Sequence, residues 1–137
     1  MKEDGLLTIY TDGAARGNPG PAAFAFIIQR EGQEDVEEKS RIGSATNNVA
    51  EYTALIKALE RAKELGGRRL LIHSDSELMV NQMKGVYKVK NAGLRPLYEE
   101  ARRLADQFEH VTIRHIRREQ NSGADALCNQ ALDGEFD

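Results

Sequence analysis

The stretch Leu-Leu-Thr-Ile-Tyr-Thr-Asp-Gly at residues 6–13 places an aspartate, Asp12, directly after a short apolar run. The same arrangement recurs at residues 69–76, Arg-Leu-Leu-Ile-His-Ser-Asp-Ser, where the aspartate is Asp75. Such short apolar runs indicate buried strands. A predicted helix lies between the two runs, and a right-handed crossover makes strands connected in this way parallel. We therefore expect Asp12 and Asp75 to be neighbours at the carboxyl ends of their strands, where open α/β sheets usually place their sites.

Glycine and proline clusters and the spacing of apolar residues predict the remaining elements. In chain order we expect a strand at 6–11, a loop at 12–21, a strand at 22–29, a turn at 31–33, a strand at 35–42, a helix at 46–65, a strand at 69–74, a short helix at 76–83, a helix at 94–108, a strand at 111–116 and a helix at 121–132. The heavily charged third strand suits an exposed sheet edge. The order predicts an α/β protein with helices packed on a mixed sheet. A chain of 137 residues forms one domain, residues 1–137.

The composition excludes several classes of protein. The single cysteine, Cys128, excludes an internal disulfide framework, and we expect it to be a small core residue. No segment approaches the roughly 18 apolar residues needed to span a bilayer. Residues 1–5, Met-Lys-Glu-Asp-Gly, are charged and do not resemble a signal peptide, so we expect a cytoplasmic location.

The charge is unevenly distributed along the chain. The 19 Lys and Arg against 22 Asp and Glu give a net charge of −3, which by itself argues against a nucleic-acid partner. Residues 84–118, however, hold nine Lys or Arg against four Asp or Glu. The total charge therefore does not exclude a basic binding surface.

Two further acidic residues are candidates for the same site. Glu51 shares a helical face with Leu55 and Ala58, so it is expected to point toward the sheet or to lie at the boundary of that face. An exposed boundary glutamate is the alternative. Asp125 lies near the start of the last predicted helix, where a carboxylate is also favourable through the helix dipole alone. Asp12 and Asp75, each taken singly, would likewise more often cap a turn or a helix.

Four converging carboxylates would require cations. At 4 Å and an effective dielectric constant of 20, each close pair costs on the order of 4 kcal/mol. Carboxylate oxygens favour Mg²⁺ or Mn²⁺, and no Cys/His spacing of the kind that binds zinc is present. Two such ions about 4 Å apart would hold a phosphodiester, activate water and stabilise the leaving oxygen.

Four blocks of the sequence together carry a family resemblance. They are Thr-Asp-Gly-Ala-Ala-Arg-Gly-Asn-Pro-Gly-Pro at 11–21, Thr-Asn-Asn-Val-Ala-Glu-Tyr at 46–52, Ser-Asp-Ser at 74–76 and Asn-Ser-Gly-Ala-Asp-Ala-Leu at 121–127. In this order and at these spacings the chain resembles type 1 ribonuclease H, in its compact form, over nearly its whole length. The resemblance implies a ribonuclease H-like fold with a mixed five-stranded sheet. It also implies an endonuclease that cuts the RNA strand of RNA/DNA hybrids with two Mg²⁺ ions, for which Mn²⁺ can substitute, leaving 5′-phosphate and 3′-hydroxyl ends.

The resemblance also implies roles for individual residues. The acidic metal ligands and catalytic residues would be Asp12, Glu51, Asp75 and Asp125. The substrate contacts would be Gly13, Asn18, Thr46, Asn47 and Ser76. Their chemistry is consistent with this, because hydroxyl and amide groups can bind phosphate oxygens or a 2′-OH. Two alternatives stay open: residues 17–20 would form a hairpin loop in any protein, and Thr46 is a plausible helix N-cap.

The chain also departs from the family pattern. Longer members carry a basic protrusion between the second and third helices, which only residues 84–93 join here, so we expect modest affinity. Lys84, Lys88 and Lys90 either substitute weakly or form a solvated loop. Many members place a histidine before the last aspartate. His115 has the spacing for this auxiliary role but lies in a predicted strand, so a strand-packed His115 is the alternative. Arg118 or Glu119, in the following loop, is the other candidate for the role.

Three further expectations complete the interpretation. We expect a monomer without an obligate protein partner. A binding module of the same fold that does not cut is one alternative function. A related nuclease that acts mainly on another substrate, such as double-stranded RNA, is a second.

Overall fold

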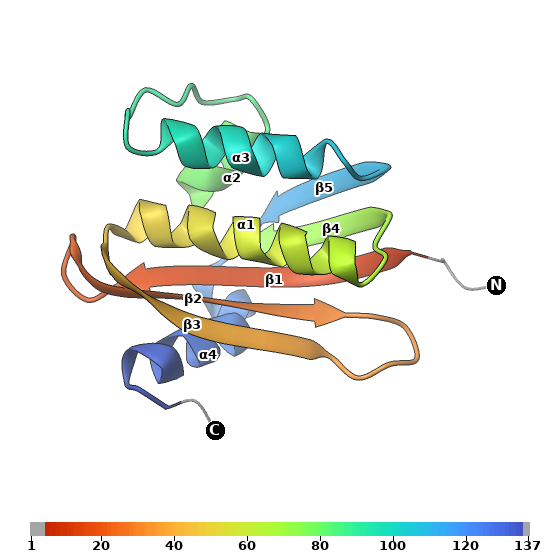
Figure 1. Ribbon diagram of the computed structural model, residues 1–137, viewed down its shortest axis with the longest axis horizontal. Helices are drawn as coiled ribbons and strands as arrows, with labels where there is room; N and C mark the ends of the chain where they lie inside the picture. Colours follow the sequence, from red (N-terminus) through yellow and green to blue (C-terminus); the bar gives the residue numbers. More distant parts are fainter. Residues whose placement is uncertain (1–4, 136–137) are drawn as a thin grey trace.

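The computed structural model describes residues 5–135, which form a five-stranded sheet in the order β3-β2-β1-β4-β5 (Figure 1). Along the chain the elements are β1 (Leu6–Ala15), β2 (Gly20–Gln29), β3 (Val36–Ala45), α1 (Asn47–Glu64), β4 (Arg69–Ser74), α2 (Glu77–Met83), α3 (Arg95–Ala105), β5 (His110–His115), a 3₁₀ turn η1 (Arg118–Asn121) and α4 (Ser122–Leu132). β1 pairs antiparallel with β2 and parallel with β4, so the sheet is mixed. This confirms the expected α/β fold, and β3 lies at an edge as its charges indicated.

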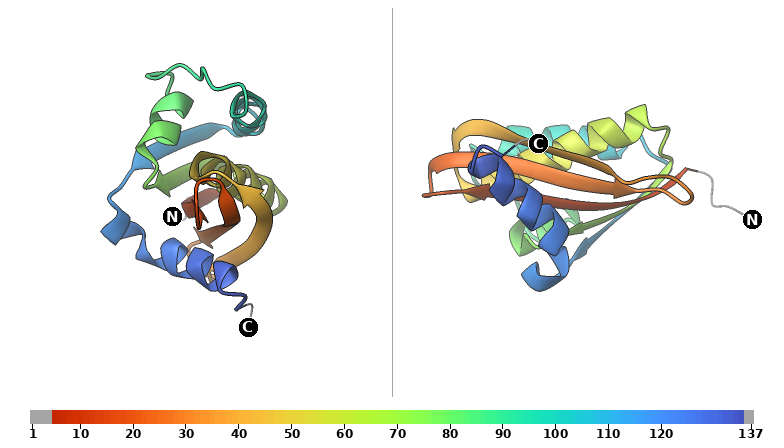
Figure 2. Two further views of the ribbon diagram at one scale, coloured as in Figure 1. Left: turned by 90° about the vertical axis from the view of Figure 1, so that its left-hand side faces the viewer. Right: turned by 90° about the horizontal axis from the view of Figure 1, so that it is seen from below.

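The helices cover the two faces of the sheet unequally. Figure 2 shows α4 on the face opposite α1 and α3. The main core lies under α1, where the predicted apolar face of the helix, including Tyr52, Leu55 and Leu59, is buried. A smaller cluster lies under α4. It contains Cys128, which is 1% exposed and donates to the Ala23 carbonyl at 3.3 Å, so the expectation of a core cysteine is confirmed.

The first strand is longer than the sequence predicted. The predictions that the strand ends at Thr11 and that residues 12–21 form a loop are wrong. β1 continues to Ala15 in antiparallel register with β2, and the connecting segment is only 16–19. The glycines and prolines are local loop signals, and the long-range pairing of β1 with β2 overrides them. The parallel register of β1 with β4 does end at the Thr11–Ser74 pair. Asp12 and Asp75 therefore both follow the last parallel pair, as expected.

Other boundaries shift less. His110, outside the strand predicted at 111–116, is the first residue of β5, and the helix predicted to reach residue 108 ends at Ala105. His73 is packed within β4: it is 9% exposed, and its ring stacks on Tyr10 with centroids 4.5 Å apart. Residues 1–4, part of the segment judged not to be a signal peptide, lie outside the described residues. None of the helices within residues 5–135 combines the length and apolar character needed to cross a membrane.

The close approach of α1 to β1 depends on Gly13. A Cβ atom at this position would lie 2.2 Å from the carbonyl carbon and oxygen of Ala50 and 2.5 Å from the Glu51 nitrogen. These are backbone atoms, which cannot turn away as a flexible side chain would. Gly13 therefore allows α1 to lie against β1 at the height of Asp12.

We expect the substitution Gly13→Ala to lower the free energy of unfolding by about 1–3 kcal/mol, because the added methyl group overpacks the contact between β1 and α1. Urea unfolding measures the change. Gly93→Ala is the matched control, since its Cβ would approach only the Asn91 side-chain oxygen, at 3.1 Å. The control should change stability by no more than about 0.5 kcal/mol. Equal stability of the two variants would contradict this view of Gly13.

Candidate active site

Three carboxylates from separate elements meet where the parallel pairing of β1 with β4 ends. Asp12 comes from β1, Glu51 from α1, and Asp75 directly follows β4; one oxygen of each lies within 4.8 Å of the others. Asp12 is 4% exposed and Glu51 is 7% exposed. The expected proximity of Asp12 and Asp75 is thus found, and the alternative of an exposed Glu51 is wrong.

Glu51 is held by the backbone of β1. The Gly13 N–H donates to Glu51 Oε1 at 3.1 Å. Burial raises the pKa of Glu51 well above its ordinary value of 4.5, and the charges of Asp12 and Asp75 add to this, while the Gly13 hydrogen bond opposes it. Because Gly13 has no Cβ atom, α1 can approach β1 closely enough for the Gly13 N–H to bind Glu51.

The carboxyl group of Asp12 lies in an electrostatically unfavourable environment. Burial, followed by the charges of Asp75 and Asp125, raises its pKa from 3.8 to about 8. Its Oδ2 atom is buried and has no hydrogen-bond partner among the described residues. A buried carboxylate oxygen without a donor, surrounded by other carboxylates, is chemically suited to a cation. The all-oxygen donor set fits Mg²⁺ or Mn²⁺.

Asp125 borders the same site from α4. With Asp12, Glu51 and Asp75 it lines a pocket of about 450 Å³, although it is not one of the three residues that lie within 4.8 Å of one another. Arg118 also lines this pocket, and its Nη2 atom lies 3.5 Å from Asp125 Oδ1. All four predicted acidic residues therefore face one pocket.

Of the predicted substrate contacts, Gly13 and Asn47 line this pocket, and Asn18 and Thr46 stabilise the structure beside Asn47. Asn18 Oδ1 accepts from the Asn47 N–H at 3.0 Å, and Asn47 Oδ1 accepts from the Ala15 N–H at 2.9 Å. Thr46 caps α1 by accepting from the Val49 N–H at 3.2 Å, which confirms the N-cap alternative without excluding a contact. Asn18 and Asn47 are exposed. The loop and the start of α1 are therefore joined into one rigid rim.

Two of the predicted contacts are more enclosed. Gly13 lines the pocket, but it is buried and its N–H already donates a hydrogen bond to Glu51. Ser76 is half-buried and caps α2, since its hydroxyl accepts from the Met79 N–H at 3.2 Å. Both residues thus have a structural function.

The two auxiliary candidates are placed differently. His115 is the last residue of β5 and is exposed, so the alternative of a packed histidine is wrong. It is not among the residues that line the acidic pocket, whereas Arg118 is. Of the two, Arg118 is the residue that contacts an acidic residue of the pocket, Asp125, although His115 pairs with Ser74 next to Asp75.

Asn121 is a site residue that sequence reasoning missed. It is 1% exposed, and its side-chain amide donates to the Thr11 carbonyl and to Asp75 Oδ2. Its position directly before the helix that carries Asp125 could have marked it as a site residue. Asparagine is, however, a common N-cap, so this position alone indicates only the start of a helix.

A five-stranded mixed sheet with acidic residues at the ends of β1 and β4 defines a domain of the ribonuclease H-like class. Residues 10–131 match the sequence profile of the Reverse transcriptase-like family. Ribonuclease HI of Halobacterium salinarum is 42% identical over 130 residues, which cover 94% of this chain and 65% of that protein. The chain belongs to the ribonuclease H family.

Solved structures agree with this membership. RNase H1 of Halobacterium salinarum superposes with a TM-score of 0.90 at 42% identity, over 95% of this chain and 99% of that one. LC11-RNase H1, solved in complex with an RNA/DNA hybrid, has a TM-score of 0.87 at 42% identity, over 93% and 97% of the two chains. A bifunctional protein of Mycobacterium tuberculosis is 43% identical over 129 residues, 93% of this chain. The chain spans only 35% of that relative's length.

The buried acids should make the metal-free protein less stable as the pH rises from about 5 to 8. The pKa of Asp12 is about 8 in the folded protein against an ordinary value of 3.8, so in this range the folded state holds a proton that the unfolded state has released. Stability then falls with rising pH, by at most about 1.4 kcal/mol per pH unit for one such group. We measure the free energy of unfolding by urea, in chelator, at several pH values. It should fall less steeply with rising pH in Asp12→Asn than in the wild type. The same pH dependence in both proteins would contradict a raised pKa at Asp12.

Proposed function

We propose that this chain is an endonuclease that hydrolyses the RNA strand of RNA/DNA hybrids by a two-metal mechanism, leaving 5′-phosphate and 3′-hydroxyl ends. The observation that carries the proposal is the cluster of Asp12, Glu51 and Asp75, whose ligand oxygens lie within 4.8 Å of one another, with one Asp12 oxygen buried and unpaired among the described residues. The similarity to LC11-RNase H1, which was solved with an RNA/DNA hybrid, supports the substrate. A single buried cysteine suits a reducing compartment, and the proposal includes a monomer in the cytoplasm.

The four acidic residues would hold two Mg²⁺ ions, which Mn²⁺ can replace. When bound there, the ions would neutralise the charge of the phosphodiester, activate water and stabilise the leaving oxygen. The protein's own contribution is to hold the ligands in place before the ions arrive. The Gly13 N–H orients Glu51 at 3.1 Å, and the antiparallel pairing of β1 with β2 keeps Asp12 on a rigid strand.

The exposed rim can recognise the backbone of the hybrid. Asn18 and Asn47 use their side-chain oxygens to bind protein N–H groups, and within residues 5–135 no protein partner is found for their NH₂ groups. These NH₂ groups are left to donate to phosphate oxygens or to a 2′-OH. Thr46, Ser76 and the backbone at Gly13 complete this proposed contact surface. Selectivity for RNA then depends on the 2′-OH, which distinguishes RNA from DNA.

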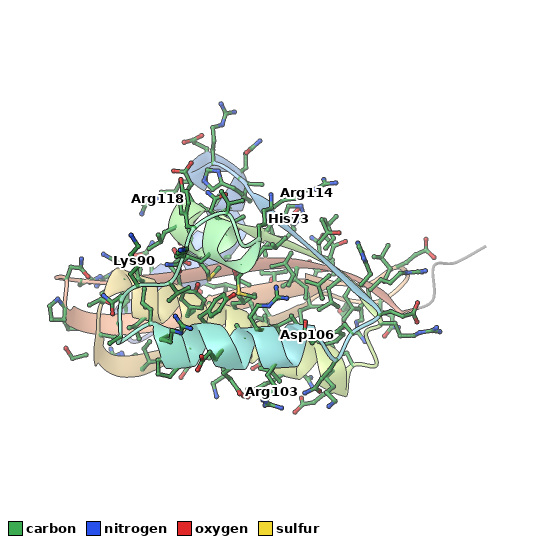
Figure 3. The ribbon with its side chains drawn as sticks, turned by 90° about the horizontal axis from the view of Figure 1, so that it is seen from above. His73, Lys90, Arg103, Asp106, Arg114 and Arg118 are labelled. Atoms are coloured by element: carbon green, nitrogen blue, oxygen red, sulfur yellow. The ribbon has the colours of Figure 1, made fainter. Side chains whose placement is uncertain are left out.

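The distribution of charge is compatible with this substrate. The acidic turn between β2 and β3 lies at the opposite end of β1 from Asp12, because Thr8 pairs with Gln29 whereas Asp12 pairs with Ala25. Figure 3 shows Arg114 and Arg118 well apart from Arg103 on α3. Few cations border the pocket, so we expect modest affinity that falls as the salt concentration rises.

Cleavage of end-labelled RNA/DNA hybrid tests the function directly. We expect cleavage of the RNA strand with Mg²⁺ or Mn²⁺ and none with chelator. Asp12→Asn and Asp75→Asn should each lower the rate by more than about a thousandfold, because loss of a ligand removes several kcal/mol of charge stabilisation. Circular dichroism checks that both variants fold.

Matched duplexes serve as substrate controls. Double-stranded DNA of the same sequence should be cut more slowly than the hybrid, because it has no 2′-OH for the proposed contacts. Cleavage of double-stranded RNA faster than the hybrid would favour the alternative of a nuclease with another main substrate. Full activity of either Asn variant would refute the metal assignment. Failure of the wild-type protein to cut the hybrid with any cation would refute the proposed activity.

Arg118 is proposed as the auxiliary residue in place of His115. It lines the acidic pocket and lies 3.5 Å from Asp125, whereas His115 does not line the pocket. We expect Arg118→Ala to lower kcat by about tenfold or more, since a charge-assisted contact contributes about 1.5–3 kcal/mol. His115→Ala should change kcat by less than about twofold, within the scatter of an ordinary surface substitution. The reverse order of the two effects would assign the role to His115.

A further inference from the structure

Asn121 does not behave as its position in the chain predicts. It ends η1 and stands at the N-cap position of α4. Asparagine is among the most favourable N-cap residues, because its side-chain oxygen can accept from the first N–H groups of a helix. Here the Asn121 side chain makes no capping bond, and the residue is 1% exposed. The side chain is thus used inside the protein and not on its own helix, and such departures from local rules are typical of functional sites.

Both contacts of the side chain are made by its nitrogen. Nδ2 donates to the Thr11 carbonyl at 2.8 Å, across 110 residues of sequence, and to Asp75 Oδ2 at 3.3 Å. An NH₂ group has two hydrogens, so these two acceptors use all of its donors. Turning the amide over would place Oδ1 against two oxygens that only accept, so its orientation is determined by its neighbours. Oδ1 is buried without a partner among the described residues, so the side chain is held by its donors alone.

The two acceptors lie where β1 and β4 separate. Thr11 and Ser74 are the last pair of the parallel register; Asp12 is the next residue of β1, and Asp75 directly follows β4. The Asn121 amide therefore links the last parallel-paired residue of β1 to the first residue beyond β4. Asp125 lies in the first turn of α4, the helix that begins next to Asn121.

We propose that Asn121 is a positioning residue of the metal site: its amide holds the Asp75 carboxylate beside Thr11 of β1 and so sets the separation of Asp75 from Asp12. The inference rests on the proposed metal-dependent function. Aspartate could not replace it, because an ionised carboxylate has no hydrogen to donate to either oxygen. Alanine would leave the Thr11 carbonyl and the Asp75 oxygen without this donor and Asp75 free to turn.

Binding of Mn²⁺ tests the role without relying on activity. Mn²⁺ is titrated into the whole chain, and the free ion is followed by electron paramagnetic resonance, for the wild type, Asn121→Ala and Asn81→Ala. Asn81 is the control because its amide donates only to a carbonyl of its own helix, that of Glu77, at 3.1 Å. We expect Asn121→Ala to bind Mn²⁺ about 10–100-fold more weakly, as is usual when a group that orients a ligand is removed. Asn81→Ala should bind within about twofold of the wild type.

Kinetics give the second readout. The Mn²⁺ concentration for half-maximal cleavage of RNA/DNA hybrid should rise in Asn121→Ala by the same factor as the dissociation constant, while KM for the hybrid stays near the wild-type value. Should Asn121→Ala fail to fold by circular dichroism, Asn121→Ser, which keeps one donor in the buried space, takes its place with the same direction of effect.

The outcomes separate the two ideas. A folded Asn121 variant that binds Mn²⁺ as tightly as the wild type would overturn the positioning role and leave the metal site standing. A wild-type protein that binds no Mn²⁺ would overturn the metal site itself, and the inference with it.

Discussion

The contact of α1 with β1 at Gly13 is the constraint on which the site depends. It brings Glu51 beside Asp12, and the Gly13 N–H then binds Glu51 Oε1 at 3.1 Å. The result is two carboxylates buried side by side, with Asp75 close enough to raise the pKa of each. Burial of like charges is unfavourable unless opposite charge is supplied. The fold thus holds an arrangement whose repulsion is relieved either by protonation, as the raised pKa values of Asp12 and Glu51 indicate, or by bound cations.

The polar residues around the cluster have two functions at once. Thr46 and Ser76 cap α1 and α2, and the Asn18 and Asn47 side chains tie the loop after β1 to the start of α1. Each of these bonds uses an acceptor and leaves donors near the pocket, which is the polarity that a phosphate backbone requires. Helix starts and strand ends supply such groups together, so the edge of this sheet is suited to a nucleic-acid backbone before any sequence-specific contact is considered.

Sequence patterns predicted what depends on local periodicity and on chain connectivity. The proximity of Asp12 and Asp75 followed from two similar strands joined by a crossover, and the inward face of α1 followed from its helical spacing. The predicted end of β1 at Thr11 was wrong. Gly13 and the prolines favour turns locally, whereas pairing with β2 keeps the backbone extended to Ala15. Asn121 was missed because its partner Thr11 is 110 residues away. The choice between His115 and Arg118 required knowing which side chain lines the pocket.

Anomalous scattering from Mn²⁺ tests the central claim most directly. In crystals of the protein with a non-cleavable RNA/DNA hybrid, we predict two Mn²⁺ peaks about 4 Å apart, both within coordination distance of the cluster of Asp12, Glu51, Asp75 and Asp125. An ordered hybrid at this surface with no Mn²⁺ bound to Asp12 would contradict the account. It would mean that the buried carboxylates are tolerated for a reason other than binding cations.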